Sequence, residues 1–378
     1  MSAPVEFPSE LLSQPTQTRL TYFQNKVVAH PRLKETHRAL LDAIQQPAGA
    51  SLIFVFGPTG VGKTTLRLRI EQQLREAANA APEHSAGQIP VIGVEAIASE
   101  RGDFKWKDYY TRALRALDEP LLAHKIDYGA CHIRRDSTGR LVVAPHVAAS
   151  DLRWALEQAL RQRQTAALIV DEAQHLKKIA GGRRLLDQMD VLKSLASLTG
   201  TVHVLVGTYE LLGLADLSAQ LNRRSCEIHF PRYRPDDPQD MTAFQSVLLT
   251  FQRHLPLTQE PDLVGHLEYF YEQSVGCVGV LKNWLTRALR VALEDQAETL
   301  TPHHLEYSAE PIRKLLRMAR EIKEGEETLQ ERETQRGELR LLLSMPTQPA
   351  QQHPTKPKRG TVERKPSRDP VGRENLAH

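Results

Sequence analysis

The residues whose types and spacing best indicate chemistry lie in a glycine-rich segment near residue 60. Gly57 to Thr64 reads GPTGVGKT, which fits the pattern G-x-x-x-x-G-K-[ST]. Its glycines allow backbone conformations that other residues avoid, so successive N–H groups can converge on phosphate oxygens. In this pattern Lys63 reaches the β- and γ-phosphates of a nucleoside triphosphate, and the Thr64 hydroxyl binds Mg²⁺. We therefore expect a site for ATP and Mg²⁺ formed by Gly57, Pro58, Thr59, Gly60, Val61, Gly62, Lys63, Thr64 and Thr65.

A second motif supplies the acidic residues that such a site needs. Residues 168–172 read LIVDE, in which the apolar residues are typical of a buried strand and two carboxylates follow at its end. The carboxyl ends of parallel strands border the crevice in which ligands bind. We expect Asp171 to hold the metal ion and Glu172 to orient and polarise the attacking water. The two motifs together predict hydrolysis of ATP to ADP and phosphate.

Three more residues are candidates because of the elements that they follow. Thr208 ends a predicted strand, where its hydroxyl could contact the γ-phosphate or the attacking water, or could cap the next helix instead. Arg223 and Arg224 lie in a turn after the helix predicted for residues 211–221. They could be surface charge, or they could reach the γ-phosphate of a neighbouring subunit as an arginine finger.

Short apolar runs separated by helical patterns predict the sheet that must position these residues. Strands are expected at 51–56, 89–96, 166–173, 201–208 and 227–230. Leucine and alanine recur at three- and four-residue spacing in the helices expected at 64–78, 106–117, 150–164 and 185–198. This alternation predicts an α/β fold with a doubly wound parallel sheet. Residues 132–144 could form a hairpin around 137–139.

The pattern changes to helices alone after about residue 235. Helices are expected at 240–251, 261–274, 278–295 and 302–319. From about residue 321 core-forming residues become rare and prolines punctuate a basic stretch, which predicts disorder. We thus expect four regions: an N-terminal extension (1–21), an α/β nucleotide-binding core (22–234), a small all-helical lid (235–320) and a disordered, basic, proline-rich tail (321–378).

Composition narrows the class of protein. With 40% hydrophobic and 25% charged residues, the 378-residue chain is typical of a soluble globular protein. We expect no membrane span, and the N-terminus lacks the features of a secretory signal. Cys131, Cys226 and Cys277 lie far apart, which favours reduced thiols over a disulfide framework or a zinc site. The net charge of +3 is compatible with nucleic-acid binding but does not require it.

Several motifs in order resemble those of the TnsC/TniB group of AAA+ transposition regulators, relatives of the MuB and IstB ATPases. The resemblance covers about residues 22–316 and rests on DEAQHL after the second motif, NRRS at 222–225 and GCVGVLK at 276–282. It implies a P-loop NTPase of the AAA+ type in the bacterial cytoplasm. It also implies assembly on double-stranded DNA as ATP-dependent rings or helical filaments. The implied partners are a target-selection protein of the TniQ/TnsD kind and a DDE transposase.

The resemblance also implies roles for individual residues. Thr208 matches the first sensor, and Arg223 or Arg224 matches the finger that acts on a neighbouring subunit. AAA+ proteins commonly place arginine in the lid helix after Gly-x-x, whereas Gly279-Val-Leu-Lys282 offers Lys282 as the nucleotide contact. Residues 27–31 (VVAHP) could line the adenine pocket as in relatives, or could be a helix-entry turn with proline at the first helical position.

DNA contacts are predicted in the segment that faces the central channel of AAA+ rings. Lys105, Lys107 and Arg112 could neutralise backbone phosphates without reading sequence. The alternative is a solvated amphipathic helix with Trp106 and Tyr110 in the core. Basic residues of the tail could engage DNA or dock the transposase, or could belong to a plain disordered terminus: Lys356, Lys358, Arg359, Arg364 and Lys365.

Three other functions share some of the features of the transposition regulator. The letters DEAQH at 171–175 suggest a superfamily-two helicase, but such a helicase needs a second RecA-like domain, and residues 235–316 are too few and too helical to form one. An AAA+ replication initiator or helicase loader shares the fold and the chemistry. A nucleotide-gated DNA clamp with little hydrolysis would share the fold without needing Glu172.

Overall fold

The computed structural model describes residues 6–81, 85, 87–97, 104–117, 133–135, 141–143, 148–177, 183–216, 224–334, 339 and 341–344. The chain divides into two compact units, residues 1–327 and 328–378. The elements below belong to the first unit, except that the last helix continues into the second. Both the sheet-bearing core and the helical lid therefore lie in one unit.

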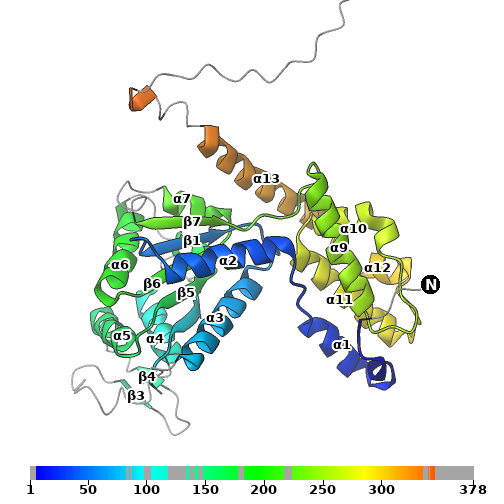
Figure 1. Ribbon diagram of the computed structural model, residues 1–378, viewed down its shortest axis with the longest axis horizontal. Helices are drawn as coiled ribbons and strands as arrows, with labels where there is room; N and C mark the ends of the chain where they lie inside the picture. Colours follow the sequence, from blue (N-terminus) through cyan, green and yellow to red (C-terminus); the bar gives the residue numbers. More distant parts are fainter. Residues whose placement is uncertain are drawn as a thin grey trace, which may run out of the picture. The chain divides into compact units, whose positions relative to one another are not determined.

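A five-stranded parallel sheet lies at the centre of the α/β part of the first unit (Figure 1). Its order is β2-β5-β6-β1-β7. The strands are β1 (Leu52–Phe56), β2 (Val91–Glu95), β5 (Ala167–Asp171), β6 (Val202–Gly207) and β7 (Ser225–His229). Every residue of β1, β5 and β6 is buried, as expected for parallel strands covered on both faces. The sequence prediction of these five strands is confirmed.

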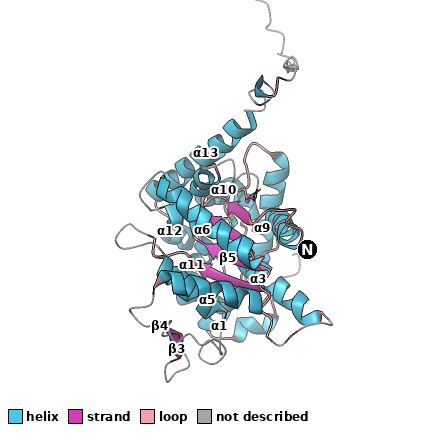
Figure 2. Ribbon diagram, turned by 90° about the vertical axis from the view of Figure 1, so that its left-hand side faces the viewer, coloured by secondary structure: helices cyan, strands magenta, loops and turns pink. Residues whose placement is uncertain are grey.

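Helices cover both faces of the sheet, and in Figure 2 the strands lie between them. On one face α2 (Pro31–Gln45) and α3 (Lys63–Ala80) pack against a set of strand residues that includes Ile53 and Val204. Neighbouring residues such as Phe54 and Leu205 point to the opposite face, because side chains alternate along a strand. There α4 (Trp106–Ala116) packs beside β2 and α5 (Ala149–Gln162), and α6 (Arg183–Thr199) packs on β1 and β6.

Short elements complete the core. The antiparallel pair β3 (Ile133–Arg135) and β4 (Leu141–Val143) confirms the predicted hairpin, whose turn at 136–140 lies outside the described residues. A 3₁₀ turn, η2 (Ala173–Lys177), follows β5 directly. The chain after β6 forms η3 (Tyr209–Leu211) and α7 (Leu212–Ala215). Residues 217–223 lie outside the described part, so the predicted helix at 211–221 is seen only in its first turn.

The lid is an all-helical cluster around Trp284. It contains α9 (Pro238–His254), η4 (Val264–His266), α10 (Leu267–Ser274), α11 (Val278–Glu294) and α12 (Pro302–Ser308). Trp284 is fully buried, and its indole Nε1 donates to the Leu305 carbonyl oxygen at 2.9 Å. A buried indole needs such an acceptor, since an unpaired N–H in the core is costly.

The N-terminal helices join the lid rather than extend the α/β core. They are η1 (Ser9–Ser13) and α1 (Thr16–Asn25). Leu20 and Phe23 of α1 are buried in the lid cluster, and the Phe23 ring lies 6.0 Å from that of Phe251. The predicted boundary at residue 22 therefore falls inside α1. It was misplaced because the apolar partners of α1 are more than 200 residues away in sequence.

The last helix corrects two predictions. The helix expected at 302–319 is divided into α12 and α13 (Ile312–Thr334), because Pro311 cannot continue an α-helix. Disorder was expected from residue 321, yet α13 continues to Thr334. It is held there by Ile322, which is buried in the core, and by the ion pair of Glu326 with Arg232 at 2.9 Å. Of the remaining tail, only residues 339 and 341–344 are described.

Composition predicted no membrane span and reduced cysteine thiols. Within the described residues, no helix combines the length and the apolar character needed to cross a bilayer. Cys226 and Cys277 are free thiols, as expected, and Cys131 lies outside the described residues.

Candidate nucleotide site

The loop between β1 and α3 needs glycine at three positions. Gly60 has φ of 85° and Gly62 has φ of 111°, which lie in the left-handed region that glycine adopts readily. A Cβ atom at Gly57 would lie 2.1 Å from the carbonyl oxygen of Phe230, so only glycine allows this close approach. The loop thus turns sharply and leads straight into the N-terminus of α3, where backbone N–H groups are free to bind an anion.

Lys63 is the first residue of α3, and its ammonium group is held inside the loop. The side chain is 9% exposed, and Nζ donates to the carbonyl oxygens of Gly57 at 2.9 Å and Pro58 at 2.8 Å. Burial lowers the pKa of Lys63 from 10.5 to about 8, against the opposing effect of the Glu172 and Asp171 carboxylates. A polyanionic ligand would favour the charged form of this lysine.

The two sequence motifs meet through Thr64 and Asp171. The Thr64 hydroxyl donates to Asp171 Oδ2 at 3.1 Å. Arg67 Nε lies 3.3 Å from the same oxygen without the geometry of a hydrogen bond, and its Nη1 pairs with Glu71 at 3.0 Å. A threonine hydroxyl beside an aspartate carboxylate is a set of hard oxygen ligands that suits Mg²⁺. These two residues therefore fit the predicted metal site.

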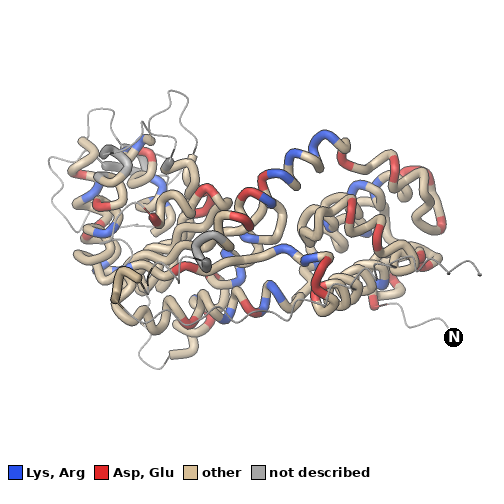
Figure 3. Tube along the Cα trace, turned by 90° about the horizontal axis from the view of Figure 1, so that it is seen from above, with Lys and Arg blue, Asp and Glu red and all other residues tan. Residues whose placement is uncertain are grey.

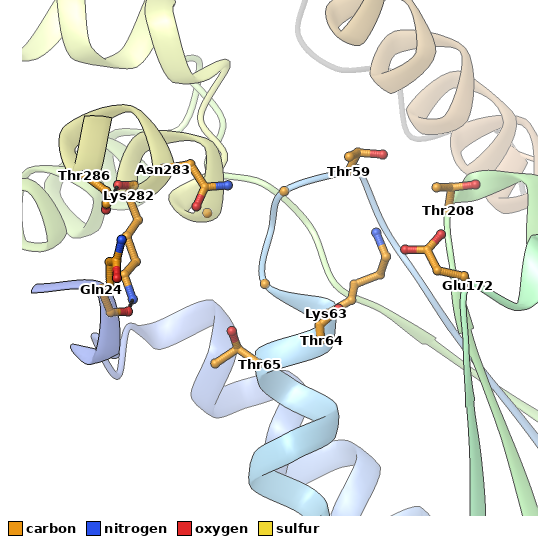
Figure 4. A pocket seen from close by; sticks show the side chains of 13 residues that line it. Gln24, Thr59, Lys63, Thr64, Thr65, Glu172, Thr208, Lys282, Asn283 and Thr286 are labelled. Carbon is orange, nitrogen blue, oxygen red and sulfur yellow. Dashed lines mark hydrogen bonds between the residues drawn. The ribbon is translucent and has the colours of Figure 1, made fainter. Parts of the chain in front are cut away.

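Glu172 follows Asp171 in an uncommon backbone conformation. Its φ of 54° is left-handed, which non-glycine residues avoid unless the surroundings enforce it. Its carboxylate accepts a hydrogen bond from the Gln174 side-chain amide. Figure 4 shows the Lys63 ammonium and the Glu172 carboxylate pointing toward each other, with Thr208 beside them. The predicted catalytic residues Lys63, Glu172 and Thr208 are thus brought together.

The structure shows no capping hydrogen bond for Thr208, one of the two roles left open, and contact with phosphate or water stays a prediction. Thr208 precedes η3, but its side chain makes no capping hydrogen bond. Its hydroxyl oxygen is a buried atom with no hydrogen-bond partner among the residues that the structure describes. Buried hydroxyl groups are rarely left unpaired. Because Thr208 lines the cavity, a rotation of its side chain would bring this unpaired hydroxyl to a group that enters the site, such as water or a phosphate oxygen.

A cavity of about 500 Å³ lies over the loop and extends to the lid. Nine of the residues predicted for the nucleotide site line it: Thr59, Gly60, Gly62, Lys63, Thr64, Thr65, Glu172, Thr208 and Lys282. Four lining residues were not predicted: Gln24, Gly279, Asn283 and Thr286. Gly57, Pro58, Val61 and Asp171 are buried behind this surface. The volume is within the range of ordinary small-molecule sites.

The lid touches the loop through the start of α11. Gly279 N donates to the Gly60 carbonyl oxygen at 2.7 Å. Residues 279, 282, 283 and 286 are three or four apart and share one face of a helix. That spacing is the signal by which Asn283 and Thr286 could have been found from the sequence. Gln24, which comes from α1, carries no comparable signal.

Lys282 lines the cavity, but its ammonium group is directed elsewhere. Nζ donates to the carbonyl oxygens of Gln24 at 2.6 Å and Lys26 at 2.5 Å, and burial lowers the pKa of this lysine. Figure 4 accordingly shows Lys282 next to Gln24 and away from Lys63. In this structure Lys282 therefore binds the segment between α1 and α2, rather than the end of the cavity where the γ-phosphate is predicted.

The segment at residues 27–31 is a helix-entry turn, as one of the two alternatives predicted. Helix α2 begins at Pro31, and the His30 imidazole accepts from Leu33 N at 3.4 Å. Burial lowers the pKa of His30 to about 4, so the ring is neutral and can accept this bond. Val27 and Val28 are not among the described residues that line the cavity.

The arginine pair is only partly described. Arg224 is exposed, and its Nη1 lies 3.4 Å from Ser197 Oγ. Arg223 lies outside the described residues. Arg224 is not among the described residues that line the cavity, and the finger remains a prediction.

The predicted DNA-binding residues lie along α4, outside the described cavity lining. Lys105 is exposed, Lys107 is partly buried, and Arg112 pairs with Asp108 at 2.8 Å. Trp106 stacks on the buried Tyr110 with ring centroids 5.5 Å apart, which agrees with the amphipathic-helix alternative. Figure 3 shows Lys and Arg interspersed with Asp and Glu along the described chain. Contact with DNA remains a prediction, and the basic tail residues 356–365 lie outside the described part.

Comparison with known proteins confirms the fold class. Residues 45–214 match the family model described as AAA domain. No match to a curated protein was found. Among solved structures, the chain is similar to the Aeropyrum pernix ORC2 protein in its ADP form, with a TM-score of 0.51, 16% identity, and coverage of 76% of this chain and 71% of that chain. It is also similar to the Aeropyrum pernix ORC1 protein in complex with DNA, with a TM-score of 0.50, 16% identity, and coverage of 77% and 68%.

At this level of identity the similarity concerns the fold alone. The chain has a P-loop AAA+ fold with a parallel five-stranded sheet and a helical C-terminal region, as predicted. The narrower resemblance to the TnsC/TniB group is not supported by these comparisons and stays a prediction.

Proposed function

We propose that this AAA+ chain binds ATP with Mg²⁺ and hydrolyses it to ADP and phosphate. The observation that supports the proposal most is the convergence of residues from separate segments on one end of the cavity. Lys63 and Thr64 come from the start of α3, Asp171 and Glu172 from the end of β5, and Thr208 from the end of β6. The carboxyl end of a parallel sheet is where ligands bind in such folds.

Each residue has a role that its position supports. The backbone N–H groups of residues 59–65 and the Lys63 ammonium bind the phosphates. Thr64 and Asp171 are the residues that would hold Mg²⁺, which when bound neutralises charge on the β- and γ-phosphates. Glu172 orients the attacking water and takes up its proton, and the Thr208 hydroxyl donates to this water or to the γ-phosphate.

Two substitutions test this proposal by separating binding from turnover. Lys63→Ala is expected to lose both ATP binding and hydrolysis. Glu172→Gln keeps the size of the side chain but removes its charge, so ATP affinity is expected to stay near wild type while kcat falls by about 10²–10⁴-fold. Glu210→Gln, which alters an exposed glutamate on η3, serves as the control. Turnover by Glu172→Gln at the wild-type rate would contradict the proposal.

We further propose that the chain acts on double-stranded DNA as an oligomer and regulates DNA transposition. The motifs DEAQHL, NRRS and GCVGVLK support this narrower function, and the fold similarity to an ORC1 protein in complex with DNA is compatible with DNA binding. In an oligomer Arg223 or Arg224 would act on the ATP of a neighbour. The proposed partners are a DDE transposase and a target-selection protein of the TniQ/TnsD kind.

A replication initiator or helicase loader is the second candidate, and the fold similarity of this chain to ORC proteins is compatible with it. Electron microscopy with linear DNA and ATP, ADP or a slowly hydrolysed analogue tests the regulator. Ordered, nucleotide-dependent rings or filaments would support it, and monomers under every condition would contradict it. A neighbouring gene for a transposase with a DDE triad would separate the regulator from the loader.

A further inference from the structure

The side chain of Gln174 connects the two residues that face the predicted attacking water. Gln174 lies in η2, two residues after Glu172, and is 7% exposed. Its Nε2 donates to Glu172 Oε2, and its Oε1 accepts from Thr208 N at 3.3 Å. The orientation of the amide follows from its partners, because an ionised carboxylate can only accept and a backbone N–H can only donate.

Gln174 occupies a closely fitted position. A Cβ atom at Gly207, the last residue of β6, would lie 2.3 Å from Gln174 Oε1. The absence of a side chain at Gly207 therefore leaves room for the amide. The backbone before it is also constrained, since Glu172 has a positive φ and His175 N donates to the Glu172 carbonyl oxygen at 3.0 Å. The turn and the amide together fix the direction of the Glu172 side chain.

The arrangement distinguishes Gln174 from the residues that touch the substrate. Glu172 and Thr208 line the cavity, whereas Gln174 is not among the described lining residues. The hydrogen bond from Gln174 Nε2 occupies one carboxylate oxygen of Glu172 and leaves the other oxygen for water. The hydrogen bond that Gln174 Oε1 accepts from Thr208 N holds the backbone of Thr208. The hydroxyl oxygen of Thr208 has no partner in the described part of the chain. One amide thus sets the distance between the carboxylate and this hydroxyl.

We propose that Gln174 is a positioning residue for ATP hydrolysis, which aligns the Glu172 carboxylate with Thr208 so that both face the same water. This inference rests on the proposed ATPase function. It predicts a defect in turnover rather than in ATP binding, because a hydrogen bond to the group that activates water affects the reaction and not the phosphate-binding loop.

Two substitutions at this position make the proposal testable. Gln174→Met has similar length but neither donor nor acceptor, and kcat is expected to fall about ten- to a hundredfold while the Kd for a fluorescent ATP analogue stays within about twofold. Gln72→Met is the matched control, because it removes an exposed Gln–Glu hydrogen bond of 2.7 Å on α3. Thermal unfolding of each variant establishes that it is folded.

Gln174→Glu adds a readout that a purely structural role would not change. Two adjacent carboxyl groups share a proton at low pH, and the protonated group introduced at position 174 can then donate to Glu172 as the glutamine does. When that proton is lost, donation ceases and the two carboxylates repel each other. The kcat ratio of variant to wild type is therefore expected to fall as pH rises from about 5.5 to 8.5. This variant is isosteric, so it tests the proposal even if Gln174→Met does not fold.

The outcomes separate this inference from the function on which it rests. A wild-type protein without ATP turnover would refute the proposed ATPase and the role of Gln174 with it. A wild-type protein that turns over ATP, with Gln174→Met equal to it in kcat or with a Gln174→Glu ratio independent of pH, would refute the role of Gln174 alone.

Discussion

Replacing Gly279 with alanine tests whether the lid and the phosphate-binding loop act as one site. Gly279 is the second residue of α11, and its N–H donates to the Gly60 carbonyl oxygen at 2.7 Å. A Cβ atom there would lie 2.5 Å from this oxygen, whereas ordinary contact begins at 3.4 Å. The neighbour is backbone and cannot rotate away. The two segments must therefore separate by about 0.9 Å, or the loop must deform.

The magnitudes predict that binding suffers more than stability. Losing the hydrogen bond costs about 0.5–1.5 kcal/mol, while alanine improves helix propensity by up to about 1 kcal/mol. When the cavity is empty, α11 can move away, and the unfolding free energy should change by about 1 kcal/mol or less. When ATP binds, lid and loop must close again, and overpacking of about 1–3 kcal/mol then weakens affinity by roughly 5- to 150-fold.

Calorimetric titration with ATP and Mg²⁺ measures this loss, and urea denaturation measures the stability. Gly87→Ala is the control, because a Cβ atom at Gly87 meets its nearest neighbour at 3.7 Å and should change neither quantity. A folded Gly279→Ala protein that binds ATP within about twofold of wild type would refute the reasoning. It would mean that the contact between Gly60 and Gly279 is not part of the bound state.

Three further predictions concern charge, core packing and the last helix. Burial lowers the pKa of Lys63 to about 8, so the unfolded state binds more protons from pH 8 to 10.5 and the contribution of this lysine to stability rises over that range. ATP affinity should fall as pH rises above 8, with proton uptake on binding that calorimetry in two buffers of different ionisation enthalpy detects. Trp284→Ala removes a fully buried indole, and urea denaturation should show a loss of about 3–5 kcal/mol; a loss below 1 kcal/mol would contradict the core described. Gly325→Ala would place a Cβ atom 2.2 Å from Tyr209 Cγ, so hydrogen exchange in α13 should accelerate, and unchanged exchange would show that α13 does not dock there.

The parts of the fold that could be predicted are those whose signal is local. Buried parallel strands read as continuous apolar runs, so β1, β5 and β6 were placed to within a residue or two. The glycine spacing at 57–62 likewise reflects backbone conformations required within a single loop. Residues 171 and 172 could be assigned because they end a strand in such a sheet.

The remainder depends on contacts between distant segments. Nothing near Phe23 shows that its partner is Phe251, so the residues that form α1 were divided between the N-terminal extension and the α/β core. Residues 321–334 are rich in charge and were read as a tail, but Ile322 gains a buried site that only the folded core provides. The direction of the Lys282 ammonium also depends on two carbonyl groups of the α1–α2 segment, which have no side-chain signature.

Equilibrium binding of ATP in the presence of Mg²⁺ tests the central claim most directly. Calorimetric titration of the full chain is expected to show saturable binding of one ATP per chain, and Lys63→Ala is expected to abolish it. Wild-type protein that is folded and shows no affinity for ATP would contradict the account of the site, and the proposed hydrolysis and DNA-linked function would fall with it.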